Sequence, residues 1–126
     1  MKKAIVSENA PKPIGPYNQA IVKGNQLFVS GQIAIHPKTG ELQTSENIED
    51  ETKLVLENLK ALVLESGFKM TDIVKCSIFV KNLDHFSKIN AVYAEYFQEI
   101  PPARECVEVS KLPKNVNVEI SCIAIL

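Results

Sequence analysis

Arg104 is the only arginine in this chain of 126 residues, although lysine and arginine together number 14. It lies in the stretch PPARECVEV, just after two prolines and at the start of a run that is typical of a strand. A guanidinium is planar, always charged and forked, so it can hold a carboxylate through two parallel hydrogen bonds, which a lysine cannot do. One such charged hydrogen bond contributes about 1.5 to 3 kcal/mol. Arg104 is therefore a candidate for binding the carboxylate of a small molecule; the alternative is a structural arginine that pairs with Glu105, Glu108 or Glu119.

Two further candidates follow from the alternation of side chains along the strands near Arg104. In the strand after Pro102, Cys106 points the same way as Arg104, whereas Glu105 points the other way. If the final strand lies beside this one, Glu119 meets Arg104 and Cys106 on the sheet face that the helices leave uncovered. Glu119 could position or deprotonate a water, or share a proton with a leaving amine. The alternative for Glu119 is a carboxylate that faces solvent.

The cysteines and histidines are weaker candidates. Cys106 would need a nearby base to act as a nucleophile, and no motif ties it to His36, in a turn, or to His85, at a helix start. The same two histidines make a poor metal site. Cys76, Cys106 and Cys122 are widely spaced and form no CxxC pair, which disfavours a disulfide framework and a zinc site. We therefore expect no metal, no disulfide and a reducing cytoplasmic location.

Two short motifs near the N-terminus point to a ligand pocket. In IGPY, Ile14 to Tyr17, the Gly-Pro turn would present Tyr17. In SGQ, Ser30 to Gln32, Gly31 lacks a side chain where a ligand or another backbone could come close. The alternatives are a plain turn and a strand bulge.

Composition and charge limit the classes of function. Hydrophobic residues make up 45% and charged residues 23% of the chain, as in globular proteins, and the length suits one domain over residues 1–126. The net charge is -1 and the isoelectric point about 6.1, so nothing favours binding to nucleic acid or to anionic membranes. The apolar run Ala4–Val6 is too short for a signal peptide, and no run approaches membrane-spanning length. We expect small-molecule or protein partners.

Apolar spacing predicts the elements that must position these side chains. A tight turn at Lys23–Asn25 joins two strands. A helix starts after the N-cap Asn47, carries acids in its first turn and ends before Gly67. Alternation in DIVKCSIFVKN predicts a strand with Val74 on the same face as the next three alternate residues. The remaining elements are a helix from near Asp84 to Pro101-Pro102, and strands in ARECVEV and VNVEISCIAI that a turn at Leu112–Asn115 separates.

This order of elements predicts an α+β fold with one mixed sheet of six strands and two helices packed on one face. Right-handed crossovers place both helices on the same side and leave the other face bare. In the last strand that bare face carries Ile123 and Ile125 beside Glu119. An apolar surface with no helix left to cover it predicts a subunit interface, and so a homo-oligomer.

Five stretches occur in an order and spacing that resemble a known family: APKPIGPYNQA, LFVSGQI, VKCSIFVKNL, FSKINAVYAEYF and PPARECVEVSKLPKNVNVEI. Over nearly the whole chain they resemble the RidA/YjgF family, the reactive-intermediate imine deaminases. The resemblance implies a chorismate-mutase-like α+β fold, a homotrimer with sites in the clefts between subunits, and no cofactor. It also implies hydrolysis of 2-iminobutanoate, 2-iminopropanoate and 2-aminoacrylate, released by pyridoxal-phosphate enzymes, to 2-oxo acids and ammonia.

The resemblance further implies roles for single residues. Arg104 matches the arginine that holds the substrate carboxylate, and Glu119 matches the acid near the attacking water. The matching pocket positions are Tyr17, Ser30, Gly31, Asn90 and Cys106. The chain departs from the family pattern at Glu105, usually a small residue, at Ser121, often acidic, and at Asn18, often serine. If the strand twists at Glu105, its carboxylate would compete for Arg104.

Two other functions remain open at this point. One is the endoribonuclease or translation inhibitor that some relatives are called; the isoelectric point, the single arginine and the lack of a base-stacking aromatic strip argue against tight RNA binding. The other is a trimer without enzymatic activity that binds small carboxylates or acts like a chaperone. That protein would use the same pocket, so the sequence hardly separates it from the enzyme.

Overall fold

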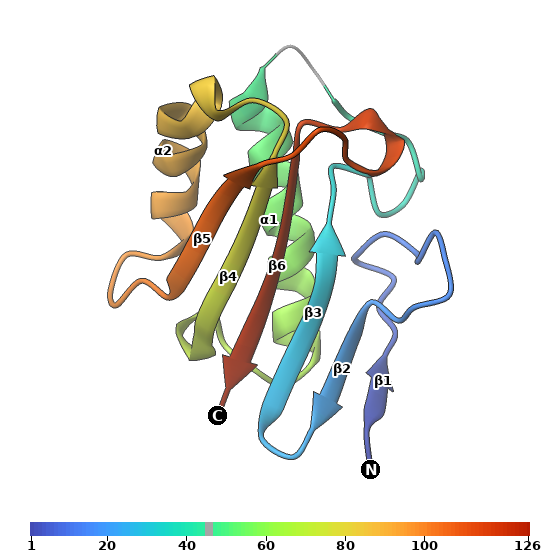
Figure 1. Cartoon of the computed structure of the whole chain (residues 1–126). Helices are drawn as coiled ribbons and strands as arrows, with labels where there is room; N and C mark the ends of the chain where they lie inside the picture. Colours follow the sequence, from blue (N-terminus) through green and yellow to red (C-terminus); the bar gives the residue numbers. More distant parts are fainter. Residues whose placement is uncertain (45–46) are drawn as a thin grey trace.

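The computed structural model describes residues 1–44 and 47–126, and its sheet has six strands in the order β1-β2-β3-β6-β4-β5 (Figure 1). The β4–β5 pair is parallel and the other pairs are antiparallel, so the sheet is mixed as predicted. The strands are β1 (Lys3–Ile5), β2 (Ala20–Lys23), β3 (Gln26–Gln32), β4 (Ile73–Val80), β5 (Ala103–Glu108) and β6 (Val118–Ile125). The helices are α1 (Ile48–Glu65) and α2 (Phe86–Tyr96), with short 3-10 helices η1 (Met70–Asp72), η2 (Leu83–His85) and η3 (Pro113–Asn115).

Helix α1 forms where its cap residues predicted it. The Asn47 side chain accepts hydrogen bonds from the backbone N–H groups of Glu49 and Asp50, at 3.0 and 3.3 Å, which satisfies donors that a helix start leaves open. Gly67 has a φ of +83°, a left-handed conformation that glycine adopts without strain and that ends the helix. The apolar stripe of α1 is fully buried against the sheet at Val55, Leu59 and Leu62 among others.

Both helices lie on one face of the sheet, behind the strands in the view of Figure 1. The core between them takes the alternate side chains of the central strands, such as Ile78 on β4 and Ile120 on β6, which have no solvent exposure. This confirms the predicted layers. Among the described residues, no helix is both long enough and apolar enough to span a membrane.

Three details differ from the sequence-based expectation. Strand β1, at the edge of the sheet against β2, was not identified, because three residues are too few to show alternation. Val74 is 44% exposed and its neighbour Ile73 is buried instead, since the β4–β6 register shifts between Ile73 and Lys75. Helix α2 ends at Tyr96, well before Pro101, and the chain leaves it at Phe97.

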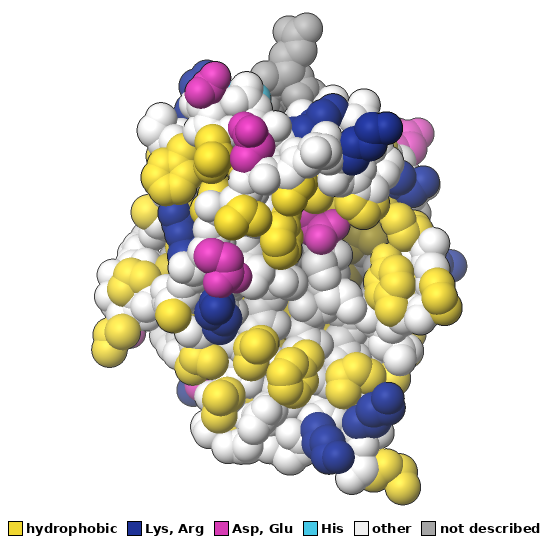
Figure 2. All heavy atoms as spheres, in the orientation of Figure 1, with side chains coloured by type: hydrophobic (Ala, Val, Ile, Leu, Met, Phe, Trp, Pro, Cys, Tyr) yellow, Lys and Arg dark blue, Asp and Glu magenta, His cyan; other side chains and the backbone are white. Residues whose placement is uncertain are grey.

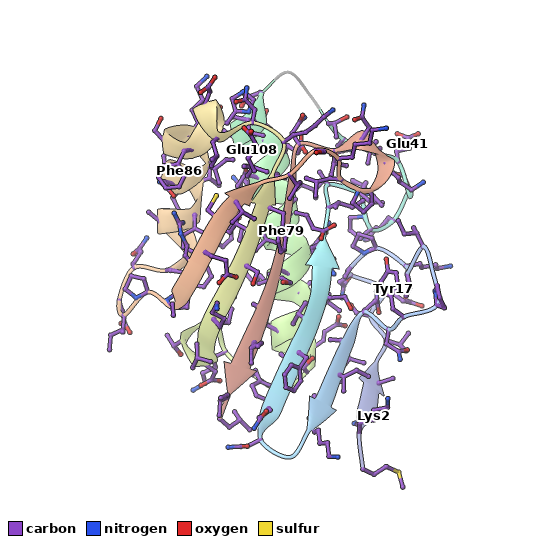
Figure 3. All side chains as sticks on the ribbon, in the orientation of Figure 1. Lys2, Tyr17, Glu41, Phe79, Phe86 and Glu108 are labelled. Carbon is purple, nitrogen blue, oxygen red and sulfur yellow. The ribbon has the colours of Figure 1, made fainter. Side chains whose placement is uncertain are left out.

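The face of the sheet opposite the helices is bare and partly apolar, as predicted. Phe28, Val107 and Ile125 are exposed on it by 42%, 40% and 38%. Figure 2 looks onto this face and shows hydrophobic side chains gathered over the strands, and Figure 3 labels Phe79 there. Exposed aromatic and aliphatic side chains on neighbouring strands are typical of a surface that another protein chain covers.

Candidate functional site

Arg104 points from β5 toward α2, and three side chains of that helix surround its guanidinium. Arg104 Nη2 donates a hydrogen bond to Asn90 Oδ1 at 2.5 Å. The guanidinium carbon lies 4.7 Å from the centre of the Tyr93 ring and 5.6 Å from that of the Phe86 ring. Both distances are within the range in which a cation is attracted to an aromatic face. The helix therefore holds the arginine without neutralising its charge.

Glu105, the acid next to Arg104, lies on the opposite face of β5 and is engaged there. Its carboxylate pairs with Lys75 Nζ at 2.8 Å and accepts a hydrogen bond from the Ser77 hydroxyl. The hydrogen bonds from Lys75 and Ser77 lower the pKa of Glu105. The Glu105 carboxylate therefore does not compete for Arg104, because side chains keep alternating between the two faces of β5 at this position.

The other two acids considered as partners of Arg104 are also placed elsewhere. Glu108 accepts a hydrogen bond from the backbone N–H of Leu83 at 2.9 Å, and Glu119 lies on the other face of the sheet. Within residues 1–44 and 47–126, the one ion pair is Lys75–Glu105. Arg104 is thus a half-buried cation with no counter-ion among the described residues. A structural ion pair inside the chain does not account for it.

The expectation that Arg104, Cys106 and Glu119 meet on one face is wrong. Strand β4 lies between β5 and β6, so the two strands that carry these residues are not neighbours. Arg104 contacts α2 on the covered side of the sheet, whereas Glu119 alternates with the buried core residues Val118 and Ile120 and so faces the bare side. The expectation failed because it depended on strand order, which alternation alone does not determine.

Glu119 fits against Gly31, where a larger residue would not leave it room. A Cβ atom on Gly31 would lie 2.6 Å from Glu119 Oε2 and 2.8 Å from its Cδ, far closer than such atoms approach. The β3–β6 register shifts between Val29 and Gln32, at this glycine. Burial raises the pKa of Glu119. The bulge and the close approach that Gly31 suggested are therefore both present.

Tyr17 and Ser30 lie near the same end of β3. The turn at Gly15 presents Tyr17, which is 44% exposed, and its backbone N–H donates to Gly15 O at 2.9 Å. Tyr17 and Gly31 line one small pocket together with residues of the 11–14 loop. The Ser30 hydroxyl donates to the backbone oxygen of Asn18 at 2.6 Å, so Ser30 anchors the segment that carries Tyr17.

The seven predicted site residues therefore form two separate groups. The Arg104 group consists of Asn90, Arg104 and Cys106, on α2 and β5; the Glu119 group consists of Tyr17, Ser30, Gly31 and Glu119. On β6, Glu119 is two strand spacings from β5, about 10 Å, and Gly31 on β3 is three, about 14 Å. Arg104 points to the covered face of the sheet and Glu119 to the bare face. Figure 3 shows Phe86, which packs on Arg104, and Tyr17 at opposite sides of the molecule. One chain alone cannot apply both groups to one small molecule.

The remaining nucleophile and base candidates stay weak in the structure. Burial raises the pKa of Cys106, against the opposing effect of Arg104, so the reactive thiolate is disfavoured. His36 Nδ1 accepts the backbone N–H groups of Lys38 and Thr39 at 3.2 and 3.3 Å, which is a turn-forming role. In the part of the chain that the structure describes, no three His, Cys, Asp or Glu side chains are grouped to hold a metal ion.

Phe86 and Tyr93 contact Arg104 but were not among the predicted site residues, because aromatic side chains at helical spacing usually pack a helix against the rest of the fold. Phe86, Asn90 and Tyr93 are spaced at i, i+4 and i+7, which places them on one face of a helix. The sequence does contain a signal for this arrangement: two aromatic rings flank an amide on one helix face, and a strand with the single arginine follows. This signal could have predicted the contacts of Arg104.

Comparisons with known proteins agree on the relationship. The family model described as Endoribonuclease L-PSP matches residues 7–126. A RutC family protein of Pyrococcus horikoshii is 54% identical, over 98% of each chain. The 2-iminobutanoate/2-iminopropanoate deaminase of Escherichia coli K12 is 46% identical, over 99% of this chain and 98% of its own. The solved structure of E. coli TdcF with bound serine has a TM-score of 0.93 at 42% identity, over 98% of both chains. The chain belongs to the Endoribonuclease L-PSP family, which includes the RidA/YjgF proteins.

Proposed function

We propose that this protein hydrolyses 2-iminobutanoate and 2-iminopropanoate to 2-oxo acids and ammonia; the enamine 2-aminoacrylate enters the same reaction once protonation of its methylene carbon has converted it to 2-iminopropanoate. The observation that carries the proposal is the half-buried Arg104, held by Asn90, with no counter-ion among the described residues. Each of these substrates has a carboxylate beside the reacting carbon. A charge that lacks an internal partner is stabilised when such a carboxylate binds it.

The geometry around Arg104 suits a bound carboxylate. Asn90 is the one side chain to which Arg104 donates within the described residues, so most N–H groups of the fork remain for a ligand. Tyr93 and Phe86 exclude water from the faces of the guanidinium without competing for those donors. A relative whose solved structure holds serine, a small molecule with a carboxylate and an amine, supports this ligand class.

We propose further that the complete site lies between two copies of the chain in a homotrimer. Arg104 points to the covered face of the sheet and Glu119 to the bare face, so a second copy is needed to bring the two groups together. The exposed apolar side chains of the bare face, among them Phe28 and Val107, supply a surface for that contact. The three free cysteines are in keeping with a reducing cytoplasm.

The chemistry needs positioning and proton transfer, with no cofactor. Water adds through its oxygen to the C=N carbon, and one water proton goes to the nitrogen, which gives a carbinolamine. The hydroxyl proton then moves to the amine nitrogen, the C–N bond breaks, ammonia leaves and C=O forms. Burial raises the pKa of Glu119, which brings this carboxyl closer to the range in which it can both accept and return a proton. Arg104 keeps the carboxylate still while this happens.

Ammonia or 2-oxobutanoate release from freshly made 2-iminobutanoate, in a coupled threonine dehydratase assay, tests the proposal. The protein should accelerate release above the spontaneous rate. In Arg104→Lys the acceleration should fall roughly 10- to 150-fold, as expected for the loss of about 1.5 to 3 kcal/mol of charged hydrogen bonding. Lys88→Ala, a change at an exposed site on the same helix as Asn90, is the control and should be silent.

Three outcomes would contradict the proposal. Full activity in Arg104→Lys would show that the carboxylate is held elsewhere. Binding of 2-oxobutanoate with no faster ammonia release would favour a carboxylate-binding protein without turnover. Cleavage of RNA by nuclease-free protein, lost in Arg104→Ala, would support the endoribonuclease instead.

A further inference from the structure

The environment of Arg104 is unusual for a binding arginine, because a buried ring supports it. Tyr93 is only 5% exposed, yet its ring lies directly under the guanidinium, at 4.7 Å from ring centre to guanidinium carbon. Asn90, one turn earlier on α2, receives the hydrogen bond from Nη2. The ring and the amide constrain different freedoms of the guanidinium: its plane and its rotation within that plane.

The hydroxyl group of Tyr93 is not what keeps this residue in place. It is buried and makes no hydrogen bond of ordinary geometry within the residues that the structure describes. Burial, and then the neighbouring Cys76 thiol, raise the pKa of Tyr93. A buried hydroxyl without a partner destabilises a fold. The contact of Tyr93 with Arg104 is made by its ring, so the contribution of Tyr93 to the site comes from its aromatic face.

We propose that Tyr93 is a positioning residue, whose ring, together with Asn90, fixes the plane of the Arg104 guanidinium so that its outer edge faces the ligand carboxylate. A free arginine side chain loses much rotational freedom when it binds, and a side chain that is already held loses less. The ring also excludes water from one face, which strengthens the charged hydrogen bonds on the edge. The inference rests on the proposed role of Arg104 in carboxylate binding.

Two substitutions separate the ring from the hydroxyl. Tyr93→Phe keeps the face and removes the unpartnered group, so 2-oxobutanoate should bind within about twofold of wild type. Tyr93→Met keeps a flexible apolar side chain in the core, smaller than tyrosine and without an aromatic face, so binding should weaken about tenfold, while the pH dependence of turnover stays as in wild type. Nuclear magnetic resonance titration with 2-oxobutanoate measures binding without turnover.

Phe97→Leu is the matched control. The Phe97 ring is also buried, at 8% exposure, and stacks on Tyr93 at 4.5 Å between centres, but Arg104 is not over it. If Tyr93 acts only through core packing, Phe97→Leu should lose as much binding as Tyr93→Met. We expect near wild-type binding in Phe97→Leu, and full binding in Tyr93→Met would overturn the inference.

Phe86 provides a second test that does not open the core. It is 42% exposed and its ring lies 5.6 Å from the guanidinium. Phe86→Leu should weaken 2-oxobutanoate binding about two- to threefold, and no change in a folded variant would argue against stacking as the source of the effect. The binding constants among these readouts stand even if the wild-type protein fails to hydrolyse imines.

Discussion

Arg104 shows how much one side chain can reveal when its type is unusual for its chain. Its uniqueness among the 14 lysine and arginine residues suggested a carboxylate-binding role and left a structural ion pair as the alternative. The missing counter-ion could not be predicted, because it depends on where Glu105, Glu108 and Glu119 point in three dimensions. Only the structure shows that each of these acids is placed elsewhere, and this placement removes the structural ion pair that the sequence had left open.

The lack of a Cβ atom at Gly31 leaves room for the Glu119 carboxylate, which allows a prediction about adding that atom. In Gly31→Ala, the added Cβ would lie 2.6 Å from Glu119 Oε2, so the carboxylate must move away from the site. We expect imine hydrolysis to fall at least about tenfold, since displacement of a proton-transfer group by an ångström is costly. Steady-state rates in the coupled assay measure this, with thermal unfolding as a check on the fold.

Gly24→Ala is the control for that substitution. Gly24 has a φ of +60° in the β2–β3 turn and nothing within 4 Å of an added Cβ. It should therefore lower stability by about 1 kcal/mol through backbone strain and leave activity unchanged. Equal activity in Gly31→Ala and wild type would contradict a role for the Glu119 position in turnover.

Among the helices and strands, α1 also fixes the position of a neighbouring strand, β6. The Glu51 carboxylate, in the first turn of α1, is fully buried and accepts hydrogen bonds from the backbone N–H and the side-chain amide of Asn117, both at 2.8 Å. These bonds tie the start of the helix to the residue that precedes β6. They fix where β6 begins relative to α1, and so they also fix the position of Glu119 on β6.

Glu51→Gln should therefore lower the free energy of unfolding substantially, although the two side chains have nearly the same size and shape. The glutamine amide presents a donor toward one of the two Asn117 donors, so one charged hydrogen bond is lost, at a cost of about 1.5 to 3 kcal/mol. Glu49→Gln, in the same helical turn, is the comparison, because it loses only the interaction with the helix dipole, about 0.5 kcal/mol. Urea unfolding measures both; equal losses would mean that the Asn117 bonds contribute nothing.

Elements with strong local signals could be predicted, and those that tertiary contacts define could not. Helix α1 has a cap, a first turn of acids and a terminal glycine, and the structure confirms all three. The short edge strand β1 has no such signal, and Val74 is exposed because of a register shift that only the partner strand determines. The order of β6, β4 and β5 also depends on tertiary contacts. Because β4 lies between the other two strands, the expectation that Arg104, Cys106 and Glu119 meet on one face was wrong.

In the whole molecule, the two groups of candidate residues and the apolar bare face have one explanation in common. Each group is incomplete: one has the charge that holds a carboxylate, and the other has the acid and the pocket of Tyr17 and Gly31. The bare face, onto which Glu119 points, carries hydrophobic side chains of several strands (Figure 2). If the bare face of one copy packs against the β5 edge and α2 of the next, the Glu119 group of the first and the Arg104 group of the second would meet.

Mixing two inactive variants measures this directly. Arg104→Ala and Glu119→Gln chains are unfolded and refolded together in equal amounts, and imine hydrolysis is compared with each variant refolded alone. If every site combines Arg104 of one chain with Glu119 of another, random assembly gives about one site in four with both residues intact, so roughly a quarter of wild-type activity should return. Mixed protein that stays as inactive as its two parents, although the chains exchange, would contradict a site shared between copies.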